Sequence, residues 1–260
     1  MAVHPNAPIL LKGRLRLLLF LAGAWMFGTF HGVDCGLGVF VPVLGRICSR
    51  RGRTALKAVR AESIEVPPLR YLGDPDLMQP QPEVQEAVEG DEVQTRLQIL
   101  REAMGVYGGI GIAAPQIGWW VRAMCFGIEA GNPRYAAAPP VPFQYWINPE
   151  ITWSSKNTSW MWEGCLSVPG MRGWVERPRE IRMRGIDEHG EAREVHLKDL
   201  PARIAQHEFD HLDGVLFPLR VESPRLLVPQ AVFDSKETWA QNWPTPGSYL
   251  TKAGELSLEK

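Results

Sequence analysis

Residues 201–214 read PARIAQHEFDHLDG and contain two histidines four positions apart, with Glu208 directly after the first. At 3.6 residues per turn, positions three and four apart share one face of a helix. We therefore expect four side chains to project together: Ile204, His207, Glu208 and His211. Two neutral imidazoles and a third protein ligand would hold a divalent ion and leave a position open for water, on which Glu208 would act as the base.

The residues around this motif also predict a helix. Asp199 suits the N-cap, Pro201 falls in the first turn, where a missing N–H costs little, and Gly214 suits the C-terminal stop. The motif would then lie inside the helix. An H-E-x-x-H pattern also arises by chance on helix surfaces, so its meaning depends on the rest of the chain.

Composition is that of an ordinary globular enzyme. A chain of 260 residues that is 45% hydrophobic can bury a full core, so we expect one catalytic domain with extensions. The formal net charge of −1 gives no electrostatic reason to expect a sequence-specific nucleic-acid partner.

The first sixty residues form a segment of different character. Residues 1–60 contain nine Lys or Arg and one acid, and residues 17–33 are uncharged if His31 is neutral. This pattern fits a signal peptide or membrane anchor, an organelle transit peptide, or untranslated sequence included by a wrong start. We favour a transit segment, because glycines interrupt the apolar run and a second basic cluster follows it. The protein would then act in a mitochondrion or plastid, and otherwise in the bacterial cytoplasm.

Cysteine usage points to a reducing compartment and to one candidate ligand. The four cysteines have no CxxC spacing and no dense framework, which argues against a zinc ribbon and a disulfide-stapled domain. Cys35 and Cys48 fall in the leader, and Cys125 lies in an apolar run that is typical of a core. Cys165, in a glycine-flanked turn after a strand, is the best candidate for the third ligand, because a thiolate suits zinc or ferrous ions.

Between the leader and the motif, periodicity predicts mainly strands. Apolar spacing predicts one helix, from Glu83 to Tyr107, and alternation or β-branched content predicts strands at 121–128, 144–152, 174–175, 180–186 and 194–197. We assign residues 64–220 to the catalytic domain. Residues 222–260 are expected to be a mostly irregular tail, which Trp239 and Trp243 could attach to the domain surface.

A glycine-rich stretch, GGIGIAAPQIG at 108–118, follows the predicted helix. It lacks the Lys-Ser/Thr of a phosphate-binding loop and no dinucleotide-type strand precedes it, so phosphate binding is weakly supported. These glycines are better explained if they leave room for the backbone of a substrate.

Three blocks together resemble the signature motifs of peptide deformylases. GIGIAAPQ (109–116), EGCLS (163–167) and QHEFDH (206–211) occur in the family's order, and the likeness covers about residues 64–220. The resemblance implies an α+β fold with mostly antiparallel sheets packed around a central helix that carries HEFDH. It also implies hydrolysis of the formyl group from formyl-methionine at the start of newly made polypeptides, with release of formate.

The resemblance assigns a role to each matching residue. Cys165, His207 and His211 would bind one divalent ion, Fe²⁺ in many family members, although these ligands alone do not choose among Fe, Zn, Co and Ni. Glu208 would be the general acid/base on metal-bound water. The remaining roles are an oxyanion hole from Gln116 and the Leu166 N–H, a substrate-lining pair, Ile110 and Gly111, and a methionine-pocket residue, Ile204.

Further expectations concern bracing, partners and rivals. Arg177 is expected to pair with Asp210 and so brace the motif helix. The implied partners are N-formylmethionyl nascent peptides and the ribosome near its exit tunnel, with the protein a monomer or weak dimer.

A zinc endopeptidase is the rival enzyme, but its third ligand lies downstream of the motif. A non-catalytic metal-holding or ribosome-associated protein is the other rival, against which intact Glu208 and Gln116 argue.

Overall fold

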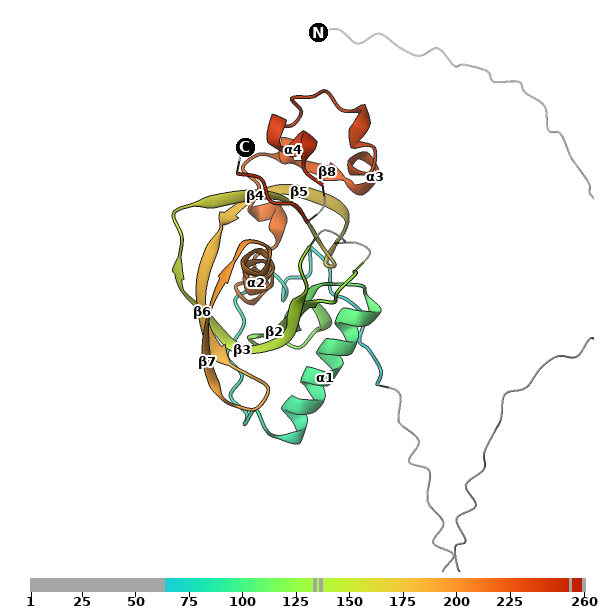
Figure 1. The fold of residues 1–260 in the computed structure, drawn as a ribbon. Helices are drawn as coiled ribbons and strands as arrows, with labels where there is room; N and C mark the ends of the chain where they lie inside the picture. Colours follow the sequence, from blue (N-terminus) through green and yellow to red (C-terminus); the bar gives the residue numbers. More distant parts are fainter. Residues whose placement is uncertain (1–63, 133–134, 136–137, 253, 259–260) are drawn as a thin grey trace, which may run out of the picture. The chain divides into compact units, whose positions relative to one another are not determined.

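The computed structural model describes residues 64–132, 135, 138–252 and 254–258, which Figure 1 shows in colour. The expectations for the leader, including Cys35 and Cys48, lie outside these residues. Among the helices within the described ranges, none is both long and apolar enough to cross a membrane.

Two antiparallel sheets form most of the fold. The larger has the strand order β1-β2-β3-β6-β7, and the smaller has the order β4-β5-β8. Their bounds are β1 Gly111–Ala113, β2 Ala123–Ile128, β3 Val141–Ser154, β4 Thr158–Cys165, β5 Val168–Pro178, β6 Glu180–Ile186, β7 Ala192–Lys198 and β8 Leu227–Pro229. The predicted combination of helices with antiparallel sheets is therefore confirmed.

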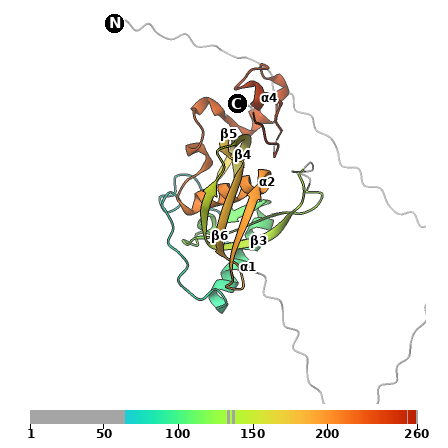
Figure 2. The same ribbon diagram turned by 60° about the vertical axis from the view of Figure 1, so that its left-hand side comes forward.

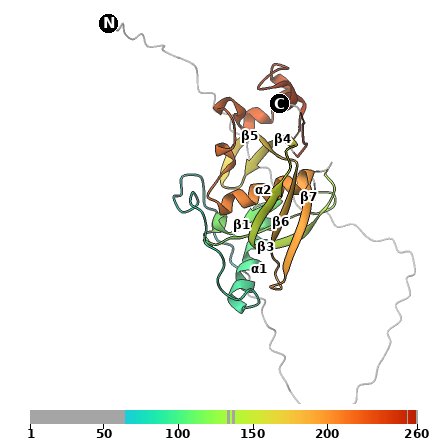
Figure 3. The same ribbon diagram turned by 90° about the vertical axis from the view of Figure 1, so that its left-hand side faces the viewer.

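Alternating side chains explain why the strands of the larger sheet form. In β6, Ile181 and Met183 are buried while Arg182 and Arg184 point to solvent, as expected of a strand with one face on a core. The same core receives the apolar side of helix α2, Asp199–Leu212, including Ile204. Figures 2 and 3 show α2 beside strands of both sheets, and it packs against β5 of the smaller sheet and β1, β2, β6 and β7 of the larger.

The N-terminus of α2 differs from the prediction. Lys198 occupies the N-cap position without a side-chain hydrogen bond, and Asp199 is the first helical residue, with a φ of 54°. The Asp199 carboxylate instead accepts a hydrogen bond from Arg179 Nε. The expected N-cap role of Asp199 is thus wrong, because Arg179, in the bend between β5 and β6, binds its carboxylate.

The predicted stop of α2 at Gly214 is confirmed. The helix ends at Leu212, and Gly214 has a φ of 71°. A Cβ at this position would lie 2.5 Å from the Gln79 backbone nitrogen. Only glycine combines the left-handed conformation with this close approach.

We expect Gly214→Ala to destabilise the protein by more than the usual cost of a left-handed alanine, which is about 1–2 kcal/mol. Gly131→Ala is the matched control, because Gly131 has a φ of 76° and no atom within 4 Å of its added Cβ. Urea unfolding of both variants measures the difference. Equal losses of stability would show that the approach of Gln79 costs nothing.

Helix α1 begins later than predicted. It spans Asp91–Val106 rather than starting near Glu83, and it buries the expected apolar face. The reason lies in β3, where the Asn148 side chain accepts from the Val84 N–H at 2.8 Å and donates to the Val84 carbonyl at 3.0 Å. These bonds occupy the backbone groups that a helix would need. Helix α1 packs on β1 and β2 at one side of the domain (Figure 1).

The C-terminal segment, residues 222–260, contains short elements separated by irregular chain. After β8 come the short helices α3, Gln230–Phe233, and α4, Pro246–Leu250. Trp239 contacts the β4 residue Trp162, with ring centroids 5.7 Å apart. Figure 1 shows this segment, in red, beside β4 and β5. Its short elements lack the periodicity that sequence analysis depends on.

Candidate active site

A tight hairpin presents Cys165 at the end of β4. Cys165 pairs with Val168 across the hairpin, so Leu166 and Ser167 form its turn. The Ser167 N–H donates to the Cys165 sulfur at 3.3 Å. This bond fixes the position of the sulfur, and a cysteine binds metal ions as the thiolate.

The structure brings Cys165 together with both histidines of α2. The Cys165 Sγ lies 3.2 Å from His211 Nε2, and one ligand atom from each of Cys165, His207 and His211 lies within 4.8 Å of the others. Ligand atoms around a tetrahedral zinc ion are about 3.5 Å apart. Burial lowers the pKa of His211 well below its usual value, so its imidazole is neutral, as a ligand must be. The three residues therefore fit a divalent ion.

Glu163 orients the other imidazole. Its Oε2 lies 2.8 Å from His207 Nδ1, which leaves Nε2 of the same ring free to face the cluster. Glu163 is only 3% exposed. Burial would raise its pKa, but the charge of Arg177 and the hydrogen bond with His207 hold it well below the usual range, so Glu163 is ionised.

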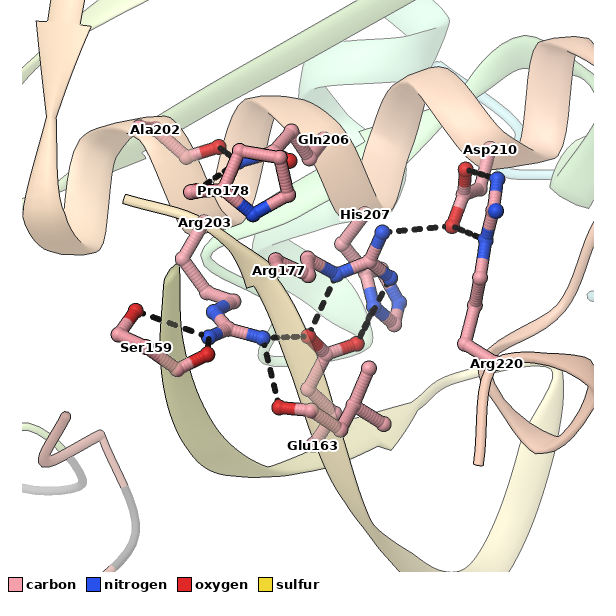
Figure 4. Close-up of polar contacts among 11 residues, drawn as sticks. Ser159, Glu163, Arg177, Pro178, Ala202, Arg203, Gln206, His207, Asp210 and Arg220 are labelled. Carbon is pink, nitrogen blue, oxygen red and sulfur yellow. Dashed lines mark hydrogen bonds and ion pairs between the residues drawn. The ribbon is translucent and has the colours of Figure 1, made fainter. Parts of the chain in front are cut away.

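A buried ionic network extends from Glu163 to the end of α2 (Figure 4). Arg177 Nε donates to Glu163 Oε1 at 2.7 Å, and Arg177 Nη1 donates to Asp210 Oδ2 at 2.7 Å. Arg203 Nη1 adds a bond to Glu163 Oε1 at 2.9 Å, and Arg220 Nη2 adds one to Asp210 Oδ1 at 2.6 Å. The expected contact between Arg177 and Asp210 is present, and the same guanidinium also reaches Glu163.

We expect Arg177→Met to destabilise the protein by about 3 kcal/mol, since it leaves buried carboxylates short of a partner. This is the lower end of the usual range, because Arg203 and Arg220 still pair with Glu163 and Asp210. Urea unfolding in the presence of a chelator measures the loss without a contribution from bound metal.

Arg184→Met is the matched control for this substitution. Arg184 pairs with Glu150, and both side chains are more than half exposed, so we expect a loss below about 1 kcal/mol. Similar losses in the two variants would mean that the buried network contributes no more than a surface ion pair.

Glu208 lies beside the cluster in an enclosed position. It is buried, and within the described part of the chain its Oε2 has no hydrogen-bond partner. Burial raises its pKa to about 7. A Cβ on Gly111 would lie 2.4 Å from Glu208 Oε1, so the glycine at this position keeps space for the carboxylate. An unpartnered buried carboxylate oxygen is the feature expected of a proton acceptor awaiting its substrate.

Hydrogen bonds fix the side chain of Gln116 beside the β4–β5 hairpin. It belongs to the short 3-10 helix η1, Ala114–Ile117, and its Oε1 accepts from the Ala113 N–H at 2.8 Å. Its Nε2 donates to Ser167 Oγ at 3.1 Å and lies 3.6 Å from Cys165 Sγ. Because the carbonyl end is fixed, the amide N–H₂ must face the cluster.

The backbone of residues 70–72, here called the N-terminal arm, binds both η1 and the turn of the β4–β5 hairpin. The Arg70 N–H donates to the Gln116 carbonyl and the Leu72 N–H donates to the Ser167 carbonyl, both at 2.8 Å. The arm therefore joins η1 to the hairpin, so that Gln116 and Cys165 keep their separation.

One cavity of about 370 Å³ contains these groups. Its lining includes eight of the residues expected from the sequence: Ile110, Gly111, Gln116, Cys165, Leu166, Ile204, His207 and Glu208. Of the remaining candidates, His211 lies in the metal cluster, and Asp210 and Arg177 lie in the ionic network behind it. The structure thus gathers every predicted site residue in one region.

Several residues of the site were not expected. Glu163 and Arg203 hold the His207 side of the network, and Tyr135 and Gln230 line the cavity. Arg203 could have been found, because it lies four positions before His207 and so shares its helix face. Gln230 has no local signal, since its place depends on how the C-terminal segment packs. Cys125 is buried in β2, as expected of a core residue.

A mixed fold of antiparallel sheets and helices, with a Cys-His-His cluster beside a buried carboxylate, defines the class of protein as a metal-dependent hydrolase. Comparison with known proteins gives the family. The polypeptide deformylase family model matches residues 66–226. The chain therefore belongs to the peptide deformylase family.

Relatives and solved structures agree with this assignment. The chain is 40% identical over 160 residues to peptide deformylase 1 of Nitrosomonas europaea, covering 62% of this chain and 90% of the relative. It is similar, at a TM-score of 0.58 and 34% identity, to a class I type b peptide deformylase from Acinetobacter baumannii bound to Met-Ala-Ser, covering 60% of this chain and 99% of that one. An actinonin complex of a Synechococcus elongatus peptide deformylase has a TM-score of 0.54 at 36% identity, covering 60% and 79%.

Proposed function

We propose that this protein removes the N-formyl group from the formyl-methionine terminus of newly made polypeptides and releases formate. The observation that carries the proposal is the cavity in which Cys165, His207, Glu208 and Gln116 meet, in a chain of the peptide deformylase family. The solved relative with bound Met-Ala-Ser supports it, because that peptide has the sequence of a deformylated terminus.

The proposed metal ligands are Cys165, His207 and His211, whose sulfur and imidazole donors suit Fe²⁺ or Zn²⁺. An ion held there would supply Lewis acidity and lower the pKa of a coordinated water toward roughly 7. We take Fe²⁺ as the working ion and Zn²⁺ as the alternative.

The chain's own residues perform the proton transfers and stabilise the developing charge. Glu208 accepts a proton from the attacking water and returns it to the departing amine. As the formyl carbon becomes tetrahedral, its oxygen gains negative charge, which the Gln116 amide and the Leu166 N–H stabilise. The position of Gln116 supports this role, because the Ala113 N–H fixes its carbonyl oxygen and its amide N–H₂ lies beside Cys165.

The cavity lining supports a methionine-containing peptide as the substrate. Ile204 and Met161 offer an apolar wall for the methionine side chain, while the backbone at Ile110 and Gly111 can pair with an extended peptide. We therefore take α2 as the central element of the fold, because it carries Ile204, both histidines and Glu208.

Formate release from formyl-Met-Ala-Ser, measured anaerobically with iron and again with zinc or cobalt, tests the proposed function. Acetyl-Met-Ala-Ser is the control, because the larger acyl group leaves the same peptide uncleaved by a deformylase. Cleavage of internal peptide bonds without formate release would instead favour the zinc endopeptidase. Binding of metal with neither activity would favour the non-catalytic rival.

Domain organisation and location complete the proposal. We propose a transit-like leader at residues 1–60, a catalytic domain at 64–220 and a C-terminal segment at 222–260. The leader would direct the enzyme to a mitochondrion or plastid, and without that role the enzyme would act in the bacterial cytoplasm. We also propose a monomer or weak dimer that works near the ribosomal exit tunnel. A mature N-terminus upstream of Arg14 would contradict the transit role.

A further inference from the structure

Beyond residue 226, where the family match ends, the described residues of the C-terminal segment are attached to β4, the strand that carries Cys165. Trp162 Nε1 in β4 donates to the Ser248 carbonyl at 2.9 Å, and the Ser257 N–H donates to the Trp160 carbonyl at 2.7 Å. Phe233 also contacts the Trp162 ring, with centroids 5.5 Å apart. These contacts give the segment a defined position beside the cavity.

Gln230 is the one residue of this segment, among those described, that lines the cavity. Its Oε1 accepts a hydrogen bond from Arg172 Nε at 2.6 Å. Arg172 is 6% exposed and also lines the cavity. A Cβ on Gly164 would lie 2.2 Å from Arg172 Nη1, so the guanidinium covers the backbone next to Cys165.

A second bond orients the Gln230 amide. Its Nε2 donates to Asp234 Oδ1 at 2.7 Å, one turn further along the chain. With the nitrogen engaged by Asp234, the amide oxygen must face Arg172. The C-terminal segment therefore holds the guanidinium in place by a charge-assisted hydrogen bond, which is stronger than a neutral one.

The position of Arg172 and Gln230 in the cavity indicates which part of a substrate they would contact. The apolar wall at Ile204 and Met161 suits the methionine side chain, whereas Arg172 and Gln230 form a polar wall of the same cavity. A peptide that continues beyond methionine brings further backbone carbonyls that the Arg172 guanidinium can bind, whereas formyl-methionine with an amidated C-terminus brings neither these carbonyls nor a carboxylate. The polar wall thus suits the residues after methionine.

We propose that Gln230 is a positioning residue for substrate recognition, through which the C-terminal segment makes binding depend on the peptide beyond methionine. This inference rests on the proposed deformylase function for its substrate class. Gln230 touches Arg172, and Arg172 forms the wall that the peptide meets.

The test compares Gln230→Ala, Gln230→Glu and the wild type, each loaded with zinc. Calorimetry measures binding of Met-Ala-Ser and of methionine amide, and formate release gives KM and kcat for formyl-Met-Ala-Ser and formyl-Met amide. We expect Gln230→Ala to weaken Met-Ala-Ser binding and to raise KM for formyl-Met-Ala-Ser, each by about tenfold. Its kcat, its affinity for methionine amide and its KM for formyl-Met amide should equal those of the wild type. Gln230→Glu keeps an acceptor for Arg172, and Asp234→Asn is combined with it so that position 234 supplies a donor instead of a second carboxylate; this pair should restore wild-type values.

Glu237→Ala is the matched control within the same segment, because Glu237 is exposed and lies outside the cavity lining. Equal losses on long and short ligands, or no loss on either, would overturn the proposal. The binding arm is independent of turnover. If the wild type released no formate, the proposed function would fail, while the Met-Ala-Ser affinities would still decide the role of Gln230.

Discussion

Replacing Glu208 with glutamine is expected to lower kcat for formyl-Met-Ala-Ser by about 10³- to 10⁴-fold while the protein keeps its metal. Glutamine has nearly the same shape, so the cavity and the space kept by Gly111 are preserved. It cannot accept the proton of the attacking water, and it cannot protonate the departing amine. The loss therefore falls on the chemical step rather than on binding, and KM should change little.

The measurements for this variant are formate release and the zinc or iron content per chain. Asp213→Asn is the matched control, because Asp213 lies just past the end of α2 and pairs with Arg122 at the surface. We expect its kcat to equal that of the wild type. A Glu208→Gln protein with bound metal and more than about a tenth of wild-type kcat would remove Glu208 from the proton transfers.

The elements that could be predicted are those whose local sequence and tertiary environment agree. Helix α2 has an apolar face and a glycine stop, and the strand prediction at 180–186 coincides with β6 because burial alternates along it. The start of α1 was placed too early, because Asn148, far away in sequence, binds the backbone of Val84. Such long-range side-chain contacts leave no periodic signal.

The residues of the candidate site also include some that the sequence could predict and some that it could not. His207, Glu208 and His211 could be predicted because their spacing within one helix is local, and Cys165 because it stands in a short motif of its own. The buried carboxylate of Glu163 could not be distinguished from a solvated strand end, since its burial depends on arginines from β5 and α2. A sequence shows which groups can react, and packing decides which charges are buried beside them.

Cys165 to Ser is expected to remove most of the bound metal and, with it, the deformylase activity. Zinc-finger sites bind with about 10–16 kcal/mol shared among four ligands, so losing one ligand costs on the order of 3 kcal/mol, or about a hundredfold in affinity. Serine is a poor replacement, because its hydroxyl stays protonated near neutral pH, whereas cysteine binds metal ions as the thiolate. Metal content after dialysis and competition with a chelator measure the change.

Cys125 to Ala is the matched control, since Cys125 is the other cysteine in the described part of the chain and is buried within β2. Burial raises the pKa of its thiol well above the usual value, which keeps it protonated and unsuited to bind a metal ion. This variant should retain wild-type metal affinity even if it loses some stability. A metal ion that binds as tightly after Cys165→Ser as after Cys125→Ala would exclude the thiol as the third ligand. The metal ion held by the two imidazoles of α2 would then need a different third ligand. The 3.2 Å distance between Cys165 and His211 would then have no role in metal binding.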